Sequence, residues 1–237
     1  GDVHHYPVDA AAVAGVVLER RGLPRQQRLL AVGHRQVVFG EADNKIIWQP
    51  RILAWYKDKI FFGEPFPQPF TGMNLYEIYR ELDCSHRLYD EYNSCLRRIE
   101  DPRVEIIERN LNEPDTMTII KTPVGQQVSV EPRVPSSWWN MEIKREVTTE
   151  EELKVAAWRE EHTTWTFDQK RFDELQATVG DLGAPTVYMP RMNVQCLYIE
   201  KMGVEKGVYA MFDMPEEIET FFRILEENHD RLIDVIN

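Results

Sequence analysis

Residues 44–60, NKIIWQPRILAWYKDKI, place one arginine and several large aromatic side chains at the end of a short apolar run. An arginine can hold a carboxylate or phosphate through paired hydrogen bonds, and tryptophan or tyrosine rings can form flat apolar walls for a ligand. Two interpretations are open. The segment is either the rim of a binding site or an ordinary corner between a strand and a helix. The residues concerned are Trp48, Arg51, Trp55 and Tyr56.

The cysteines are a second group that could do chemistry. Cys84, Cys95 and Cys196 are widely spaced and form no CxxC pair, which favours free thiols in a reducing cytoplasm over a disulfide framework. Cys84 and His86 superficially suggest a metal site, but no second pair of ligands stands at a suitable spacing. Cys196 has no histidine close in sequence, so we expect a packed thiol rather than a nucleophile.

The acidic balance of the chain argues against whole classes of partner. The 40 Asp and Glu residues exceed the 28 Lys and Arg residues, which gives a formal charge of −12 over 237 residues. Because nucleic acids and anionic membranes are bound by basic surfaces, we expect neither as a partner. No apolar run approaches the ~20 residues of a membrane span. Asp2 and Asp9 precede the apolar patch at 10–18, where a signal peptide would be positive, so a cytoplasmic protein is expected.

Hydrophobic periodicity predicts alternating helices and strands, which is typical of a layered α/β domain. The 74–96 helix is expected to break near 83–85, and turns near 112–115 and 123–125 would make the central strands antiparallel neighbours. Thr148 and Glu151 have the spacing of a capping box. The expected helices cover residues 1–24, 24–37, 74–96, 147–175 and 213–237, and the expected strands cover 45–48, 104–111, 116–134 and 183–190.

Several motifs also occur in a suggestive order. RLLAVGHRQ at 28–36 leads into DNKIIWQPR at 43–51, and GMNLYEIYRELDC follows at 72–84. KTPVGQQVSV at 121–130 precedes WNMEIKREVTTEEELKVAAW at 139–158, and VYAMFDMPEEIETFFRILEENHDRLI ends the series at 208–233. In this order the motifs resemble the N-terminal two-thirds of a uroporphyrinogen decarboxylase-like protein. The superfamily also holds the corrinoid-dependent methyltransferases, and the resemblance covers roughly residues 25–237.

The resemblance implies a TIM (β/α)8-barrel with a β-hairpin insertion and with its chemistry at the C-terminal mouth of the strands. Residues 1–24 would be an N-terminal helical extension, and residues 25–237 the N-terminal portion of the barrel domain. If residues 46–51 are the first barrel strand, the rim interpretation is favoured, with Arg51 holding an anionic group. Arg191 would then be a ligand contact after the 183–190 strand, although a turn with this arginine in solvent is the alternative. The implied substrate-binding residues are Trp48, Arg51, Trp55, Tyr56, Arg191 and Gln195.

The activity that the resemblance implies is methyl transfer, linked to a corrinoid or folate, on a small anionic or methylated substrate. Porphyrinogen decarboxylation is disfavoured, because the family's first loop carries two arginines and QPRILAWYK at 49–57 has one. Zinc is not supported, since the chain contains no His-x-Cys. Decarboxylation of a smaller substrate is an alternative, and the sequence assigns no catalytic acid, base or nucleophile.

The number of expected strands raises a question of partners. About four barrel strands are expected before Asn237, whereas a closed barrel has eight. Half a parallel barrel would leave open sheet edges and uncovered apolar surface. We therefore expect a fragment, a barrel completed by a second copy or a partner subunit, or a different closure. A non-catalytic subunit that only contributes ligand contacts is the corresponding alternative function.

Overall fold

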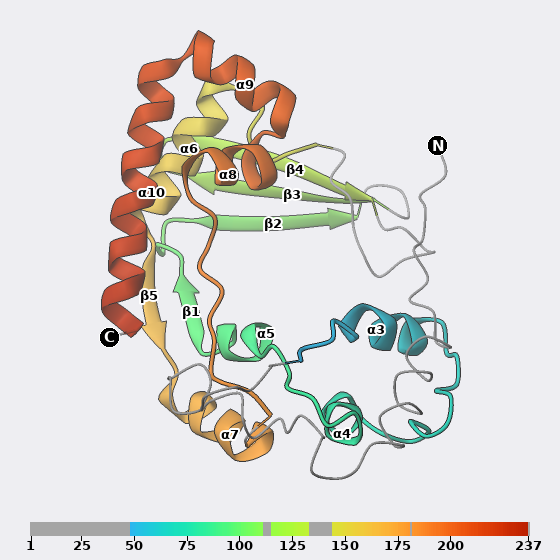
Figure 1. The fold of residues 1–237 in the computed structure, drawn as a ribbon. Coiled ribbons are helices and arrows are strands. Elements are labelled where there is room, and N and C mark those ends of the chain that lie inside the picture. The colour runs from blue at the N-terminus through green and yellow to red at the C-terminus, as the bar shows by residue number, and fades with distance from the viewer. Residues whose placement is uncertain (1–47, 111–114, 133–143, 181, 237) are drawn as a thin grey trace. The chain divides into compact units, whose positions relative to one another are not determined.

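The chain divides into two units, and each unit is assembled from segments that are distant in the sequence (Figure 1). The chain passes from one unit to the other after residues 94, 168 and 187. Unit 1 comprises residues 1–94 and 169–187, and unit 2 comprises residues 95–168 and 188–237. The computed structural model describes residues 48–110, 115–132, 144–180 and 182–236. The helices predicted at 1–24 and 24–37, and with them the N-terminal extension, lie outside the described residues.

The predicted TIM barrel is wrong. The described strands form one two-stranded and one three-stranded antiparallel sheet, and no closed barrel. The links between strands give the physical reason, since two residues, Pro123 and Val124, join β3 (Asp115–Thr122) to β4 (Gly125–Pro132). So short a turn can only connect antiparallel neighbours, whereas a parallel barrel needs a crossover of a dozen or more residues between strands.

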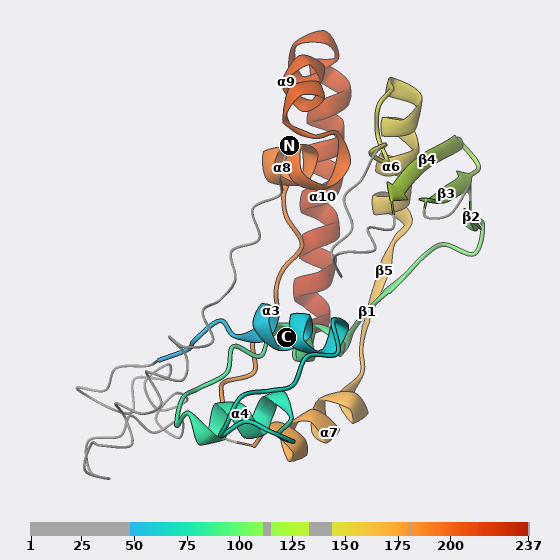
Figure 2. The same ribbon diagram turned by 90° about the vertical axis from the view of Figure 1, so that its right-hand side faces the viewer.

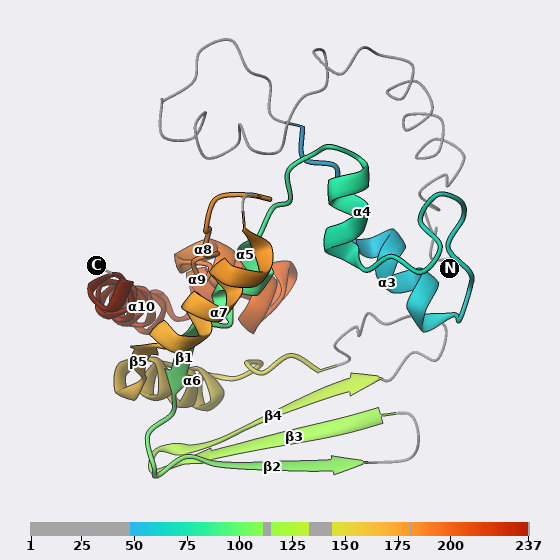
Figure 3. The same cartoon turned by 90° about the horizontal axis from the view of Figure 1, so that it is seen from below.

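The three-stranded sheet of unit 2 confirms the predicted antiparallel strands. β2 (Glu105–Asn110) and β4 flank β3, as Figure 3 shows. Ile120 of β3 pairs with Ile106 on one side and with Gln127 on the other, and Ile120 and Gln127 are both buried. Gly125 begins β4 with φ +146, and a Cβ there would lie 3.2 Å from Cγ2 of Val155. Helix α6 therefore lies directly against this end of the sheet.

Helix α6 (Glu150–His162) starts three residues after the start of the helix predicted at 147–175, and its cap lies one residue after the predicted cap, Thr148. Thr149 caps it by accepting a hydrogen bond from the Glu152 backbone N–H at 3.2 Å, and Glu152 Oε2 accepts from the Thr148 N–H at 2.7 Å. The predicted helix at 147–175 is interrupted because residues 164–167, TWTF, form β5 (Thr164–Phe167) instead. This β-branched and aromatic segment pairs with β1 (Leu96–Ile99), a strand that was not predicted and of which only Leu96 lies in the helix predicted at 74–96.

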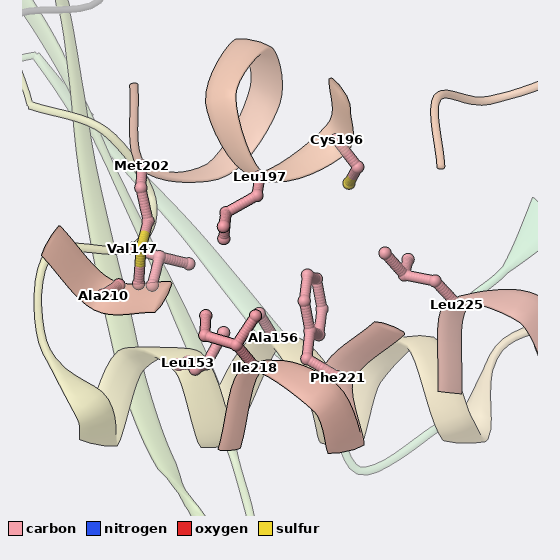
Figure 4. Close-up of a cluster of buried hydrophobic side chains, with 10 residues drawn as sticks. All are labelled: Val147, Leu153, Ala156, Cys196, Leu197, Met202, Ala210, Ile218, Phe221 and Leu225. Carbon is pink, nitrogen blue, oxygen red and sulfur yellow. The ribbon is translucent and has the colours of Figure 1, made fainter. Parts of the chain in front are cut away.

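The predicted C-terminal helix is confirmed as α10 (Pro215–Ile236), which packs against α6 and β5. Its apolar stripe is buried at Ile218, Phe221 and Leu232, whereas Ile233 and Ile236 are exposed. Figure 4 shows how this stripe meets α6 and the preceding segments in one hydrophobic core. The core comprises Val147, Leu153, Ala156, Cys196, Leu197, Met202, Ala210, Ile218, Phe221 and Leu225.

The segment before α10 contains no strand, so the strand predicted at 183–190 is wrong. Three short helical elements follow it: α8 (Asn193–Gln195), the π-helix η2 (Cys196–Lys201) and α9 (Val204–Asp213). Gly203 has φ +81 and separates η2 from α9, a conformation that favours glycine. Figure 2 shows α9 beside the N-terminal end of α10.

Unit 1 is helical in its described residues, with α3 (Leu53–Phe61), α4 (Leu75–Glu81), α5 (Tyr89–Asn93) and α7 (Gln169–Val179). The predicted break in the 74–96 helix is confirmed, because α4 ends before Asp83, which has φ +51. Of the strand predicted at 45–48, only Trp48 is described, and it belongs to no strand. The buried core of the unit includes Phe70, Ile78, Tyr79, Leu88, Tyr92 and Leu175.

Candidate functional site

Unit 2 contains a small cavity of about 80 Å³ whose walls carry several charged side chains. β1, α6 and β5 supply one part of the lining, and the segment from residue 190 through η2, together with α10, supplies the rest. A concave space with a few convergent polar groups can bind a small molecule. Its charged lining residues are Arg98, Glu160, Arg191, Glu200 and Lys201.

Buried ion pairs hold the deeper side of the cavity. Lys201 is only 9% exposed, and its Nζ lies 2.9 Å from Glu146 Oε2 and 3.8 Å from Glu160 Oε1. Arg98 Nη1 donates to both oxygens of Glu160, at 3.1 and 3.0 Å, and its Nε donates to Glu100 at 3.1 Å. Glu160 is therefore held by two cations from elements far apart in the sequence.

Charge pairing outweighs burial in this network. Burial raises the pKa of Glu146, but Lys201 beside it holds that pKa below its ordinary value. For Lys201, burial opposes the charged form, yet the neighbouring Glu146 and Glu160 carboxylates raise its pKa above the ordinary value. Lys201 is thus a fixed cation at neutral pH, which suits it to binding an anion and not to acting as a nucleophile.

Hydrogen bonds from uncharged side chains complete the wall near α10. The Trp165 indole N–H donates to Asn228 Oδ1 at 2.8 Å, and Asn228 Nδ2 donates to Glu160 Oε2 at 2.7 Å. His229 is buried and donates from Nε2 to the Pro190 carbonyl oxygen at 2.8 Å. These bonds fix the aromatic and imidazole rings beside the cavity.

Arg191 forms the more exposed side of the cavity. Its Nη1 donates to Glu200 Oε1 at 3.0 Å, and the guanidinium lies 5.9 Å from the centre of the Tyr188 ring. Cys196 donates from Sγ to Glu200 Oε2 at 3.7 Å, and burial, followed by the Glu200 charge, raises the pKa of its thiol to about 12. The thiol is protonated at neutral pH, as expected of a packed cysteine. The three cysteines are all free and buried.

Hydrogen-bond donors outnumber acceptors around the cavity. An arginine has five N–H donors and a lysine has three. Arg98 uses Nε and Nη1, and Arg191 uses Nη1 alone, so each has donors without an acceptor among the described residues. The Glu160 carboxylate, in contrast, already accepts from Arg98 and Asn228 and lies near Lys201. The lining is therefore complementary to a ligand that accepts hydrogen bonds.

Two of the predicted site residues lie in unit 2, and one of them lines the cavity. Arg191 does so, whereas Gln195 is exposed at the end of α8 and is not among the lining residues. The residues that sequence reasoning missed come from β1, α6, β5, η2 and α10. The sequence did contain a signal for Asn228 and His229. Both stand at positions where the helical spacing of the α10 apolar stripe calls for an apolar residue.

The other four predicted site residues lie in unit 1, where Trp55 and Tyr56 pack against other aromatic rings. Trp55 is buried, with ring centres 5.5 Å from Phe66 and 6.0 Å from Phe70 in edge-to-face geometry. Tyr56 stacks on Phe66 at 5.2 Å. Arg51 is exposed, and the Trp48 carbonyl accepts from the Ser85 N–H at 3.1 Å. This packing fits an ordinary corner at the start of helix α3. That these residues form the rim of a binding site stays a prediction.

A second polar cluster lies in unit 1, at the Cys84-Ser85-His86 triplet. His86 Nε2 lies 2.9 Å from Glu91 Oε1, and the imidazole stacks on Tyr79 with ring centres 4.2 Å apart. Cys84 Sγ donates to the Tyr79 carbonyl at 3.6 Å. Burial raises the pKa of Glu91, but its bond to His86 brings that pKa below the ordinary value. These contacts tie α4 to α5 through a His–Glu pair whose histidine is buried.

Two further findings bear on the identity of the chain. Among the helices of the described segments, none is both long and apolar enough to cross a membrane. Comparison of the chain with family models, curated proteins and solved structures gives no match.

Proposed function

We propose that unit 2 binds a small organic anion, specifically a carboxylate, in the cavity between β1, α6, η2 and α10. The observation that carries the proposal is the set of unused N–H donors: Arg98, Arg191 and Lys201 each pair with a carboxylate, and the two guanidinium groups keep donors without an acceptor among the described residues. A carboxylate matches the planar guanidinium group and accepts the donors that remain. Burial strengthens such charge-assisted bonds.

The volume limits the ligand to a few atoms. A cavity of about 150 Å³ in a protein core holds benzene, so about 80 Å³ suits a group of roughly half that size. Formate and acetate are the simplest carboxylates of that kind. Very small ligands gain at most about 1.5 kcal/mol per non-hydrogen atom, so the four such atoms of acetate limit its Kd to about 0.04 mM, and we expect a value near 1 mM.

The arrangement favours binding over catalysis in unit 2. Lys201 is held as a cation and Cys196 as a thiol, so neither supplies a nucleophile at neutral pH. Corrinoid- or folate-linked methyl transfer stays a prediction from the resemblance, as do decarboxylation of a non-porphyrin substrate, a non-catalytic partner subunit and a cytoplasmic location. A small anionic substrate is common to the methyl-transfer prediction and the present proposal.

The test is a calorimetric titration of the full chain with a graded set of carboxylates. We expect formate and acetate to bind near 1 mM, and butyrate to bind at least about tenfold more weakly because it exceeds the cavity. Acetamide is the matched control, since it has the shape of acetate without the charge, and it should not bind. Equal binding of acetate and acetamide, or no binding of either at about 50 mM, would contradict the proposal.

A further inference from the structure

Helix α9 packs with its smallest residues inward. Gly207 and Ala210 are its buried positions, and Ala210 belongs to the hydrophobic core of unit 2 (Figure 4). The backbone at Gly207 approaches Tyr198 of η2 so closely that a Cβ would lie 2.6 Å from the ring carbon Cδ1. A helix on a globular core usually turns its large apolar residues inward. Because α9 packs so closely on η2 at Gly207, the opposite face of α9 is left at the surface.

The outer face of α9 carries the large apolar side chains. Val204, Val208, Met211 and Phe212 recur at i, i+4, i+7 and i+8 and therefore share one side of the helix. All four are exposed, Val204 at 63% and Phe212 at 81%. We call this set the α9 stripe. Contiguous apolar patches of this kind on a soluble protein mark interaction sites, and the i/i+4/i+7/i+8 spacing is that of helix-to-helix contacts.

Three acidic residues lie close to the α9 stripe along the chain, and we call them its acidic border. Glu205 lies on the helix itself, Asp213 ends it, and Glu216 follows in the first turn of α10. All three are exposed, and none forms an ion pair with another residue in the part of the chain that the structure describes. Lys206 is the single basic residue of α9. The border therefore has free negative charge, in keeping with the formal charge of −12 of the chain.

We propose that the α9 stripe binds a basic amphipathic helix of a partner protein, with apolar residues against Val208 and Phe212 and with Lys or Arg residues against Glu205, Asp213 and Glu216. Apolar anchors supply the affinity, and complementary charge selects the partner and speeds its association.

The same charges disfavour the other occupants. In a symmetric dimer both copies present the same surface, so the acidic borders of two α9 stripes would face each other. An anionic lipid surface would likewise repel the border, because membrane-binding helices carry basic residues on their polar face.

The test uses the full chain and two fluorescein-labelled synthetic helical peptides of equal length. Both peptides carry leucines at i, i+3, i+4 and i+7, and one bears lysines beside the leucines where the other bears glutamates. Fluorescence anisotropy should show saturable binding of the lysine peptide, weakening as salt rises, and at least about tenfold weaker binding of the glutamate peptide.

Substitutions assign the binding surface. Phe212→Ala should weaken binding of the lysine peptide by about 30-fold, the size expected of a central aromatic anchor. Ile106→Ala is the matched control, because Ile106 is an exposed apolar residue on β2 of the same unit, and it should leave binding unchanged. Circular dichroism of each variant confirms that the fold is retained.

Three results would overturn the proposal. The first is equal affinity for the two peptides, which would remove the role of charge. The second is unchanged binding in both Phe212→Ala and Val208→Ala, which would place the peptide elsewhere. The third is a dimer in sedimentation that Val208→Glu dissociates, which would assign the α9 stripe to a second copy of the chain.

Discussion

Lys201 Nζ lies 2.9 Å from Glu146 Oε2, and this ion pair joins η2 to the segment that leads into α6. Both side chains are largely removed from solvent, at 11% and 27% exposure. The same ammonium group also lies 3.8 Å from Glu160. Removing one member of a buried ion pair leaves the other charge without compensation, which costs more free energy than the pair contributes.

Lys201→Met should lower the free energy of unfolding by about 3–5 kcal/mol, because it leaves Glu146 buried without its cation. The double variant Lys201→Met with Glu146→Met should recover most of the loss, since no uncompensated charge then remains. Urea unfolding of unit 2, followed by fluorescence, measures both. Equal stability of Lys201→Met and the unsubstituted chain would show that this pair is solvated.

Acid should destabilise unit 2 below about pH 4.5. Arginine or lysine partners hold the pKa of Glu100, Glu146 and Glu152 below the ordinary value of 4.5, although burial acts in the opposite direction. The folded state thus binds fewer protons than the unfolded state, so this stability is present above pH 4.5 and is lost as pH falls through the lowered pKa values. Urea midpoints measured from about pH 7 to about pH 3 should fall, and Glu146→Gln should flatten the curve.

Arg191→Gln should weaken acetate binding by about 10- to 100-fold, since it removes a charge-assisted interaction of roughly 1.5–3 kcal/mol. The side chain is 34% exposed, so its loss should leave the fold intact. Lys154→Gln is the control, because Lys154 is an exposed cation of α6 that pairs with Glu150 at 2.5 Å outside the cavity. If the two substitutions reduce affinity equally, general electrostatic attraction and not the cavity accounts for binding.

Gly207→Ala should destabilise unit 2 by about 1–3 kcal/mol, even though alanine favours helix by about 1 kcal/mol over glycine. The added methyl group would lie 2.6 Å from Cδ1 of Tyr198. Combining the change with Tyr198→Ala should remove the clash, so the second substitution should cost less in the Gly207→Ala background than alone. Additive losses in thermal unfolding would mean that the two residues are not in contact.

The three cysteines should react slowly with a thiol reagent in the folded chain. All are buried, and the pKa of Cys196 is raised to about 12, so little of the reactive thiolate is present near pH 8. Labelling with 5,5′-dithiobis(2-nitrobenzoate) should be slow in buffer and complete in urea. A fast phase in buffer would show that at least one thiol is accessible.

Local signals predicted the elements whose structure depends on local sequence. The 3.6-residue periodicity of apolar residues was sufficient to predict α10, and the alternation of residues was sufficient to predict β2, β3 and β4. The capping pattern before α6 placed the cap of this helix to within one residue. β1 was missed because LRRI at 96–99 has no strand pattern of its own. It becomes a strand by pairing Ile99 with Thr164, a contact that sequence spacing does not reveal.

The barrel expectation failed because an order of motifs does not determine how strands pair. The two-residue link at Pro123 and Val124 does determine it, and it requires an antiparallel neighbour. Arg191 is the one lining residue of the cavity that was predicted. Arg98, Glu160 and Lys201 were not predicted, because they are distant in the sequence and meet through tertiary packing. Asn228 and His229 could have been found, since polar residues within an apolar helix stripe imply buried partners.

The most direct test of carboxylate binding in unit 2 is the indole N–H resonance of Trp165, which lines the cavity and donates to Asn228. Nuclear magnetic resonance of the ¹⁵N-labelled chain, with the signal assigned by Trp165→Phe, follows this group during titration with acetate and with acetamide. We predict a saturable shift of the Trp165 signal with acetate near 1 mM and none with acetamide. A Trp165 signal that stays in place while acetate reaches about 50 mM would contradict binding in this cavity.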